Sequence, residues 1–214
     1  MVCAQTAPAA EVRILALGDS YTIGEAVQPD ARWPVQLAAL LRTHGVAAAQ
    51  PVIVARTGWT TDELSAGIDA AHLHGPYDLV TLLIGVNNQY RGRRADEYRS
   101  QFRALLARAV AFANSCADRV IVVSIPDWGV TPFAVGRDRA GISAAINRFN
   151  AIDQEEAIRA GVRFVDITPI SRRVTVEHGL VAADGLHPSE MMYAEWVREL
   201  LPVALDALGR RAPP

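Results

Sequence analysis

The sequence contains no lysine, and all 21 of its lysine and arginine positions are arginine, in a chain of 214 residues. P-loop nucleotide-binding proteins, pyridoxal enzymes and hydrolases of the Ser-x-x-Lys type each depend on a lysine. Composition therefore excludes these three classes. Apolar runs of about 20 residues are also absent, so no segment is predicted to span a bilayer. Residues 1–10 lack the charged and apolar regions of a signal peptide, and the compartment stays open.

Cysteine and clustered charge are scarce as well. Cys3 and Cys116 are too few for a disulfide framework or a zinc site, and we expect both to be unpaired. His72 and His74 have no neighbouring carboxylate or cysteine pattern, so no metal site is predicted. The net charge of −2 comes from interspersed acidic and basic residues, which indicates neither a nucleic-acid partner nor a membrane surface. The oligomeric state is left open.

What the sequence does contain is a regular alternation of strand-like and helix-like segments. The predicted strands, which are apolar enough to be buried on both faces, are Val12–Leu17, Pro51–Ala55, Leu79–Ile84, Val120–Ile125 and Val162–Val165. The predicted helices are Arg32–His44, Asp62–His72, Asp96–Ala117, Arg139–Ala160 and Ser189–Leu208, with Ser189 as the N-cap of the last. This order is typical of a parallel five-stranded sheet between two helical layers. We predict one three-layer α/β/α domain over residues 11–209, a disordered or linker tail at 1–10 and a short tail at 210–214.

The first three strands end in residues that suit acyl transfer. Ser20 follows the first strand, Gly58 the second and Asn87 the third. Because the carboxyl ends of parallel strands meet at one edge of the sheet, these residues should lie close together. A serine that attacks an ester generates an oxyanion, which the N–H of a glycine and the amide of an asparagine can stabilise without adding negative charge. The sequence therefore predicts Ser20 as a nucleophile with donors at Gly58 and Asn87.

A base for this serine is found just before the last helix. Asp184 precedes His187 by three residues in a turn, where the carboxylate can accept from Nδ1 and leave Nε2 free for the nucleophile. Of the other histidines, His44 follows a predicted helix, His72 and His74 flank the end of another, and His178 lies beside Glu177 in a polar turn. Asp19, next to the serine, is interpreted as a structural turn residue.

Four blocks of this sequence resemble those of the SGNH hydrolases, also called the GDSL esterase/lipase family. They are Gly18-Asp19-Ser20-Tyr21, the turn with Gly58, Gly85-Val86-Asn87-Asn88 and Asp184-Gly185-Leu186-His187-Pro188. The resemblance implies a flavodoxin-like sheet of order 2-1-3-4-5, ester or thioester hydrolysis without a cofactor, and a triad of Ser20, His187 and Asp184. It also implies an oxyanion hole of the Ser20 N–H, the Gly58 N–H and the Asn87 side chain. Two positions depart from the family pattern: Tyr21 replaces a leucine, and Asn88 replaces a common aspartate.

The substrate is less clearly indicated. Expected pocket walls are Tyr21, Trp59, Val86, Tyr90, Trp128 and Phe133. The last two belong to a long irregular segment, Pro126–Arg137, and can equally anchor it to the core. The arginines of Arg91-Gly92-Arg93-Arg94 can attract an anionic substrate, although a solvated helix entry is the favoured interpretation.

Small acyl esters are the predicted substrates. Thioesters, lysophospholipids and acetylated carbohydrates are alternatives within the same family. An alternative of another class is a non-enzymatic, flavodoxin-like module in which Ser20 and Gly58 bind a phosphate or nucleotide. That alternative leaves Asp184 and His187 without a role.

Overall fold

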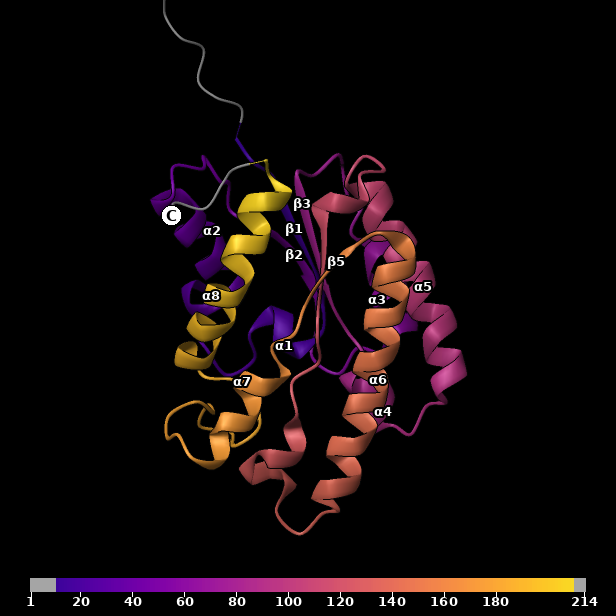
Figure 1. Ribbon diagram of the computed structural model, residues 1–214, viewed down its shortest axis with the longest axis vertical. Coiled ribbons are helices and arrows are strands. Elements are labelled where there is room, and N and C mark those ends of the chain that lie inside the picture. The colour runs from indigo at the N-terminus through magenta and orange to yellow at the C-terminus, as the bar shows by residue number, and fades with distance from the viewer. Residues whose placement is uncertain (1–10, 210–214) are drawn as a thin grey trace, which may run out of the picture.

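The computed structural model describes residues 11–209 and shows five parallel strands between two layers of helices (Figure 1). The strand order is β2-β1-β3-β4-β5, so the predicted flavodoxin-like order is confirmed. The strands are β1 (Ile14–Gly18), β2 (Val52–Ala55), β3 (Leu79–Leu83), β4 (Val120–Val123) and β5 (Arg163–Val165). The predicted tails at 1–10 and 210–214, and Cys3, lie outside the described residues.

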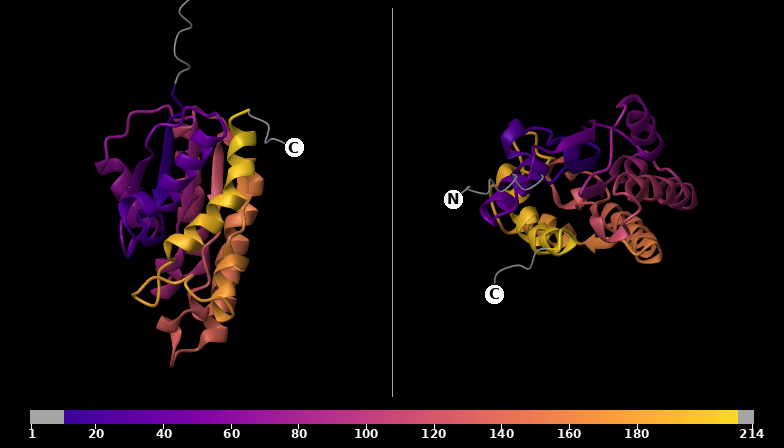
Figure 2. Two further views of the ribbon diagram at one scale, coloured as in Figure 1. Left: turned by 90° about the vertical axis from the view of Figure 1, so that its left-hand side faces the viewer. Right: turned by 90° about the horizontal axis from the view of Figure 1, so that it is seen from above.

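The main helices form two groups, one on each face of the sheet (Figures 1 and 2). On one face α2 (Trp33–Thr43) packs against α8 (Glu190–Ala207). On the other face α5 (Ala95–Phe112) packs against both α3 (Thr61–Ala70) and α6 (Arg139–Ala160). Ser189 caps α8 as predicted, because its hydroxyl accepts from the Met192 N–H. No helix within residues 11–209 is long and apolar enough to cross a membrane.

The central strands carry the core. Every residue of β1, β3 and β4 is buried, because helices cover both faces of these strands. The prediction of burial on both faces is wrong for the two edge strands: Val52 in β2 is exposed, and Arg163 and Phe164 in β5 are half-buried. An edge strand has a neighbour on one side only, so helices cover it less completely.

Several short helices lie between the main elements and were not predicted from the sequence. They are α1 (Ser20–Ile23), α4 (Val86–Tyr90) and α7 (Thr168–Arg172), together with the single-turn 3-10 helices η1 (Pro29–Ala31), η2 (Ala117–Arg119), η3 (Trp128–Val130), η4 (Pro132–Ala134) and η5 (Arg173–Thr175). Runs of three to five residues are too short to show a helical period. Two of these turns, η3 and η4, give the segment 126–137 a defined structure. In Figure 1 the segment 126–137 lies at the lower end of the molecule, below α1 and α4, which follow the carboxyl ends of β1 and β3.

Candidate active site

Ser20 is the first residue of α1, directly after the central strand β1. Gly18 makes the tight turn possible: a Cβ there would lie 2.2 Å from Thr22 Oγ1 and 2.5 Å from the Leu83 carbonyl oxygen. Asp19 caps α1 by accepting a hydrogen bond from the Tyr21 N–H at 3.0 Å. The turn therefore holds Ser20 in place at the carboxyl edge of the sheet.

Asp19 itself is fully buried. Burial raises its pKa from 3.8 to about 7, although hydrogen bonds from backbone N–H groups act in the opposite direction. One carboxyl oxygen holds the turn, and the other, Oδ2, has no hydrogen-bond partner among the described residues. Asp19 therefore shapes the turn before Ser20, in agreement with its interpretation as a structural turn residue.

The second strand contributes Gly58, whose φ of +87° is a backbone conformation that favours glycine. No neighbouring atom closer than the Arg91 guanidinium, at 3.7 Å, would meet a Cβ at this position. Glycine is therefore required here by the backbone conformation and not by lack of space. The Gly58 carbonyl accepts from Arg91 Nη2 at 2.5 Å, which anchors the turn from outside.

Asn87, in α4 after the third strand, is held in a defined orientation. Its Nδ2 donates to the Trp59 carbonyl at 2.9 Å. A side-chain amide has two N–H bonds, so this interaction uses one of them and leaves the other available for a ligand. The contact also ties the turn after β3 to the turn after β2.

The contacts of the neighbouring Asn88 explain why it replaces the aspartate that is common in the family. It is buried, accepts from the Thr61 N–H at 3.1 Å and donates to Thr61 Oγ1 at 2.7 Å. An aspartate could not make the second of these contacts as a donor while ionised. Asparagine therefore keeps the two turns connected with neutral partners only.

Asp184 and His187 form a close pair in the turn that leads into α8. His187 Nδ1 lies 2.6 Å from Asp184 Oδ2, and Asp184 Oδ1 accepts from the backbone N–H groups of Leu186 at 2.9 Å and His187 at 3.0 Å. Burial alone would raise the pKa of Asp184, but these hydrogen bonds outweigh it and lower the pKa below its ordinary value. Because the ionised carboxylate only accepts, Nδ1 carries the proton and Nε2 is left as an acceptor.

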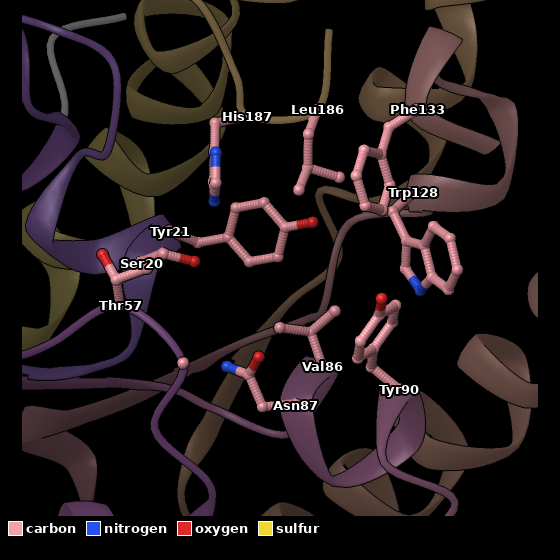
Figure 3. Close-up of a pocket in the computed structure, with 11 residues that line it drawn as sticks. Ser20, Tyr21, Thr57, Val86, Asn87, Tyr90, Trp128, Phe133, Leu186 and His187 are labelled. Atoms are coloured by element: carbon pink, nitrogen blue, oxygen red, sulfur yellow. The ribbon is translucent and has the colours of Figure 1, made fainter. Parts of the chain in front are cut away.

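The structure brings the five predicted site residues together. Ser20, Gly58, Asn87 and His187 line one cavity of about 210 Å³. Asp184 is the one that does not line the cavity, and it contacts His187 instead. Figure 3 shows the His187 ring pointing toward Ser20 from one side, with Asn87 on the other. The hydrogen bonds of the described residues do not include one between Ser20 Oγ and His187 Nε2. In serine hydrolases without substrate this contact is often long and tightens only when substrate binds.

The cavity walls are largely as predicted. Of the expected wall residues, Tyr21, Val86, Tyr90, Trp128 and Phe133 line it (Figure 3). The prediction for Trp59 is wrong: its ring packs against the Gly67 backbone of α3, where a Cβ would lie 2.1 Å from the indole, and only its carbonyl serves the site. Thr57 and Leu186 also line the cavity and were missed. Both are neighbours of predicted residues, which was the available clue.

The segment 126–137 both packs against the core and lines the cavity. It therefore serves as an anchor and as a pocket wall at the same time. Trp128 is buried and donates from Nε1 to Gln89 Oε1 at 2.8 Å. The Phe133 N–H donates to the Gly185 carbonyl at 2.9 Å, between Asp184 and Leu186. The segment is thus hydrogen-bonded to the turn that carries His187.

The arginine cluster after α4 is engaged in ion pairs, as the favoured interpretation of a solvated helix entry predicts. Arg91 pairs with Glu63, Arg93 with Asp62 and Glu97, and Arg94 with Asp96. Cys116 is a free, exposed thiol. Within residues 11–209 no group of three or more histidine, cysteine or acidic side chains is arranged to hold a metal ion.

The fold and this cavity place the chain in the class of α/β ester hydrolases. The family model described as GDSL-like Lipase/Acylhydrolase matches residues 16–195, and the chain belongs to this family. The resemblance predicted from four short blocks is therefore confirmed, and with it the prediction of a carboxylic ester hydrolase. A non-enzymatic binding module, the alternative of another class, is not supported.

Solved structures with the same fold share little sequence with this chain. A structure of TesA has a TM-score of 0.72 at 19% identity, covering 92% of this chain and 99% of that one. A psychrotrophic esterase, EstA from Pseudoalteromonas sp., inhibited by monoethylphosphonate, has a TM-score of 0.70 at 15% identity, covering 94% and 100%. A catalytic mutant of Axe2, an acetylxylan esterase from Geobacillus stearothermophilus, has a TM-score of 0.69 at 18% identity, covering 95% and 97%. No curated protein sequence matches the chain significantly.

Proposed function

We propose that this protein hydrolyses small acyl esters through an acyl-enzyme formed on Ser20, with His187 as the base and Asp184 orienting it. The observation that supports the proposal most is the contact of His187 Nδ1 with Asp184 Oδ2 at 2.6 Å, in an imidazole whose other nitrogen faces the cavity that contains Ser20. Membership of the family supports the same assignment.

In the first step Ser20 Oγ attacks the ester carbonyl carbon while His187 Nε2 takes the hydroxyl proton. The carbonyl oxygen becomes an oxyanion and accepts from the Ser20 N–H, the Gly58 N–H and the free N–H of Asn87 Nδ2. Each such donor contributes on the order of 3–4 kcal/mol to the stability of the transition state. The C–O bond then breaks, and the alcohol leaves with the proton from Nε2.

In the second step a water molecule attacks the acyl-enzyme carbonyl and gives its proton to Nε2. The same donors stabilise the second oxyanion, the bond to Ser20 Oγ breaks, and His187 returns the proton to the serine. Asp184 stays ionised throughout and stabilises the imidazolium that forms twice in the cycle.

Small substrates are proposed because the cavity is small and apolar. Its volume of about 210 Å³ lies below the roughly 300–1,000 Å³ of pockets that hold drug-sized ligands. Val86, Leu186 and the rings of Trp128 and Phe133 suit a short acyl chain. A second candidate, a carbohydrate acetylesterase, is favoured by the same aromatic rings, because they can stack on a sugar face. Thioesters and lysophospholipids are the remaining alternatives.

Two variants and a covalent probe test the proposal. Ser20→Ala should reduce kcat/KM for 4-nitrophenyl acetate by several orders of magnitude while the circular dichroism spectrum stays unchanged. Ser100→Ala, an exposed serine of α5, is the matched control and should retain full activity. A serine-directed phosphonate should label the wild type and Ser100→Ala once per chain at Ser20, as read by mass spectrometry. Retention of wild-type activity by Ser20→Ala, or labelling elsewhere, would refute the assignment.

A panel of esters then decides between the substrate classes. Straight-chain 4-nitrophenyl esters from acetate to octanoate, an acetylated xylose, a short acyl thioester and a lysophospholipid should be compared by kcat/KM. We expect the highest value among the short esters. A clear maximum for the acetylated sugar would favour the second candidate instead.

A further inference from the structure

Arg137 lies at the edge of the cavity, against its aromatic wall. Its guanidinium carbon is 4.7 Å from the ring centroid of Phe133 and 5.7 Å from those of Tyr90 and Trp128. These three rings also line the cavity that contains Ser20. Contact between a guanidinium and aromatic rings is attractive and restricts the position of the side chain. Arg137 is therefore a cation held at a defined place beside the proposed site of reaction.

The charge of Arg137 is not neutralised by a neighbour. The Arg137 guanidinium forms neither a hydrogen bond nor an ion pair with any residue in the range 11–209, and the Arg137 side chain is exposed. Arg139, two residues on, behaves differently: it donates to the carbonyls of Gly129 and Val130, both at 2.7 Å, and so fastens the segment. Arg91, Arg93 and Arg94 are all paired with carboxylates. Hydrogen bonds and ion pairs within the protein explain the positions of those arginines, whereas Arg137 has no such partner in the part of the chain that the structure describes.

A second, more open hollow of about 620 Å³ lies on the other side of the same wall. It shares Tyr90 and Trp128 with the first cavity, and its remaining lining residues are Gln89, Arg137, Asp138, Gly141 and Ile142. Asp138 is the one carboxylate in this lining. It caps α6 by accepting from the Gly141 N–H at 2.9 Å, so the positive end of the helix partly compensates its charge. The side-chain donors offered to a ligand in this hollow are the Arg137 guanidinium, the Gln89 amide and the Tyr90 hydroxyl, of which only Arg137 is a cation.

We propose that Arg137 determines substrate specificity by binding an anionic group, a carboxylate or a phosphate, carried by the ester. An ester carbonyl held at Ser20 leaves one end of the molecule to pass the Tyr90 and Trp128 rings and meet the guanidinium. A planar guanidinium binds carboxylate and phosphate oxygens through two parallel N–H bonds, and the aromatic contacts hold it ready to do so. This inference rests on the proposed function, since it names the class of ester that the same site prefers.

Matched ester pairs test the role of Arg137. One pair carries the charge on the acyl side: the mono-4-nitrophenyl ester of glutaric acid against 4-nitrophenyl pentanoate. The other carries it on the alcohol side: monobutyrylglycerol 3-phosphate against monobutyrylglycerol. Arg137→Gln should lower kcat/KM for the charged member of at least one pair by about tenfold, mainly through KM. The same variant should change the neutral members by less than twofold. The pair that responds shows whether the site binds a carboxylate on the acyl side or a phosphate on the alcohol side.

Arg148→Gln is the matched control, because Arg148 is an exposed arginine of α6 that does not line either cavity. It removes the same charge and should leave all four esters unaffected. Equal effects of Arg137→Gln on charged and neutral esters, or the same selective loss in Arg148→Gln, would overturn the proposal. A tryptophan-fluorescence titration with glutarate and with glycerol 3-phosphate provides a measurement that does not depend on turnover, and Arg137→Gln should abolish saturation. If Ser20→Ala retained activity while this binding still required Arg137, the proposed function would fail and the anion site would stand.

Discussion

The ionisation of Asp19 gives the most quantitative prediction. This carboxyl group is fully buried one residue before Ser20, and burial raises its pKa from 3.8 to about 7. Asp19→Asn keeps the size of the side chain and the oxygen that accepts from the Tyr21 N–H. It removes only the group that has to ionise. The variant therefore isolates the contribution of this one proton to the free energy of unfolding.

The sign and size follow from proton linkage. Between pH 4 and pH 7 the folded protein keeps the Asp19 proton while the unfolded chain releases it, so stability falls as the pH rises. A pKa of about 7 in the folded state and 3.8 in the unfolded state corresponds to roughly 4 kcal/mol of lost stability above pH 7. Between pH 5 and pH 8 the loss is roughly 2–3 kcal/mol.

Urea denaturation at pH 5, 6, 7 and 8, followed by circular dichroism, measures this effect. The difference in unfolding free energy between Asp19→Asn and the wild type cancels every other titrating group that the two proteins share. That difference should shift in favour of the variant by roughly 2–3 kcal/mol between pH 5 and pH 8. A difference that stays constant across this range would show that Asp19 ionises normally in the folded protein, and the reasoning from its burial would be wrong.

Four further predictions concern the site and its support. Asn87→Ala should lower kcat by about 10²–10³ with little change in KM, because it removes one oxyanion donor, and steady-state kinetics on a short ester will measure this. Asp184→Asn should lower kcat by on the order of 10³–10⁴ through loss of the correct imidazole tautomer. In the wild type kcat/KM should fall with decreasing pH, because the mechanism needs an imidazole that can accept the Ser20 proton, whereas the lowered pKa of Asp184 keeps that carboxylate ionised; a value of kcat/KM that stays unchanged down to about pH 4 would contradict the assignment. Gly18→Ala should destabilise the fold by about 1–3 kcal/mol or more, because its Cβ would lie 2.5 Å from the Leu83 carbonyl oxygen, and urea denaturation will test it.

Much of the fold could be predicted because its causes are local. Buried parallel strands need continuous apolar runs. Helix α6 begins after Asp138, which caps its N-terminus, and ends before Gly161, which takes the left-handed conformation typical of a helix C-terminus. The predicted ends of the strands differ from the observed ends by one or two residues, because apolar side chains continue beyond the last hydrogen bond between neighbouring strands. Edge strands differ from central ones only in what covers them, so the exposure of Val52 was not predictable from its own segment.

The sequence by itself determined which residues meet at the site, namely those of the three turns and the Asp184–His187 pair. Each block is short, and parallel strands bring their carboxyl ends to one edge of the sheet. Tertiary structure decided which way the neighbouring side chains face. Trp59 turns toward Gly67 and leaves the cavity, while Thr57 and Leu186 enter it. It also decided that Arg137 lies over three aromatic rings without a carboxylate partner, whereas the arginines after α4 are paired. A side chain's direction depends on contacts between segments distant in sequence, and a pattern read along one segment does not contain them.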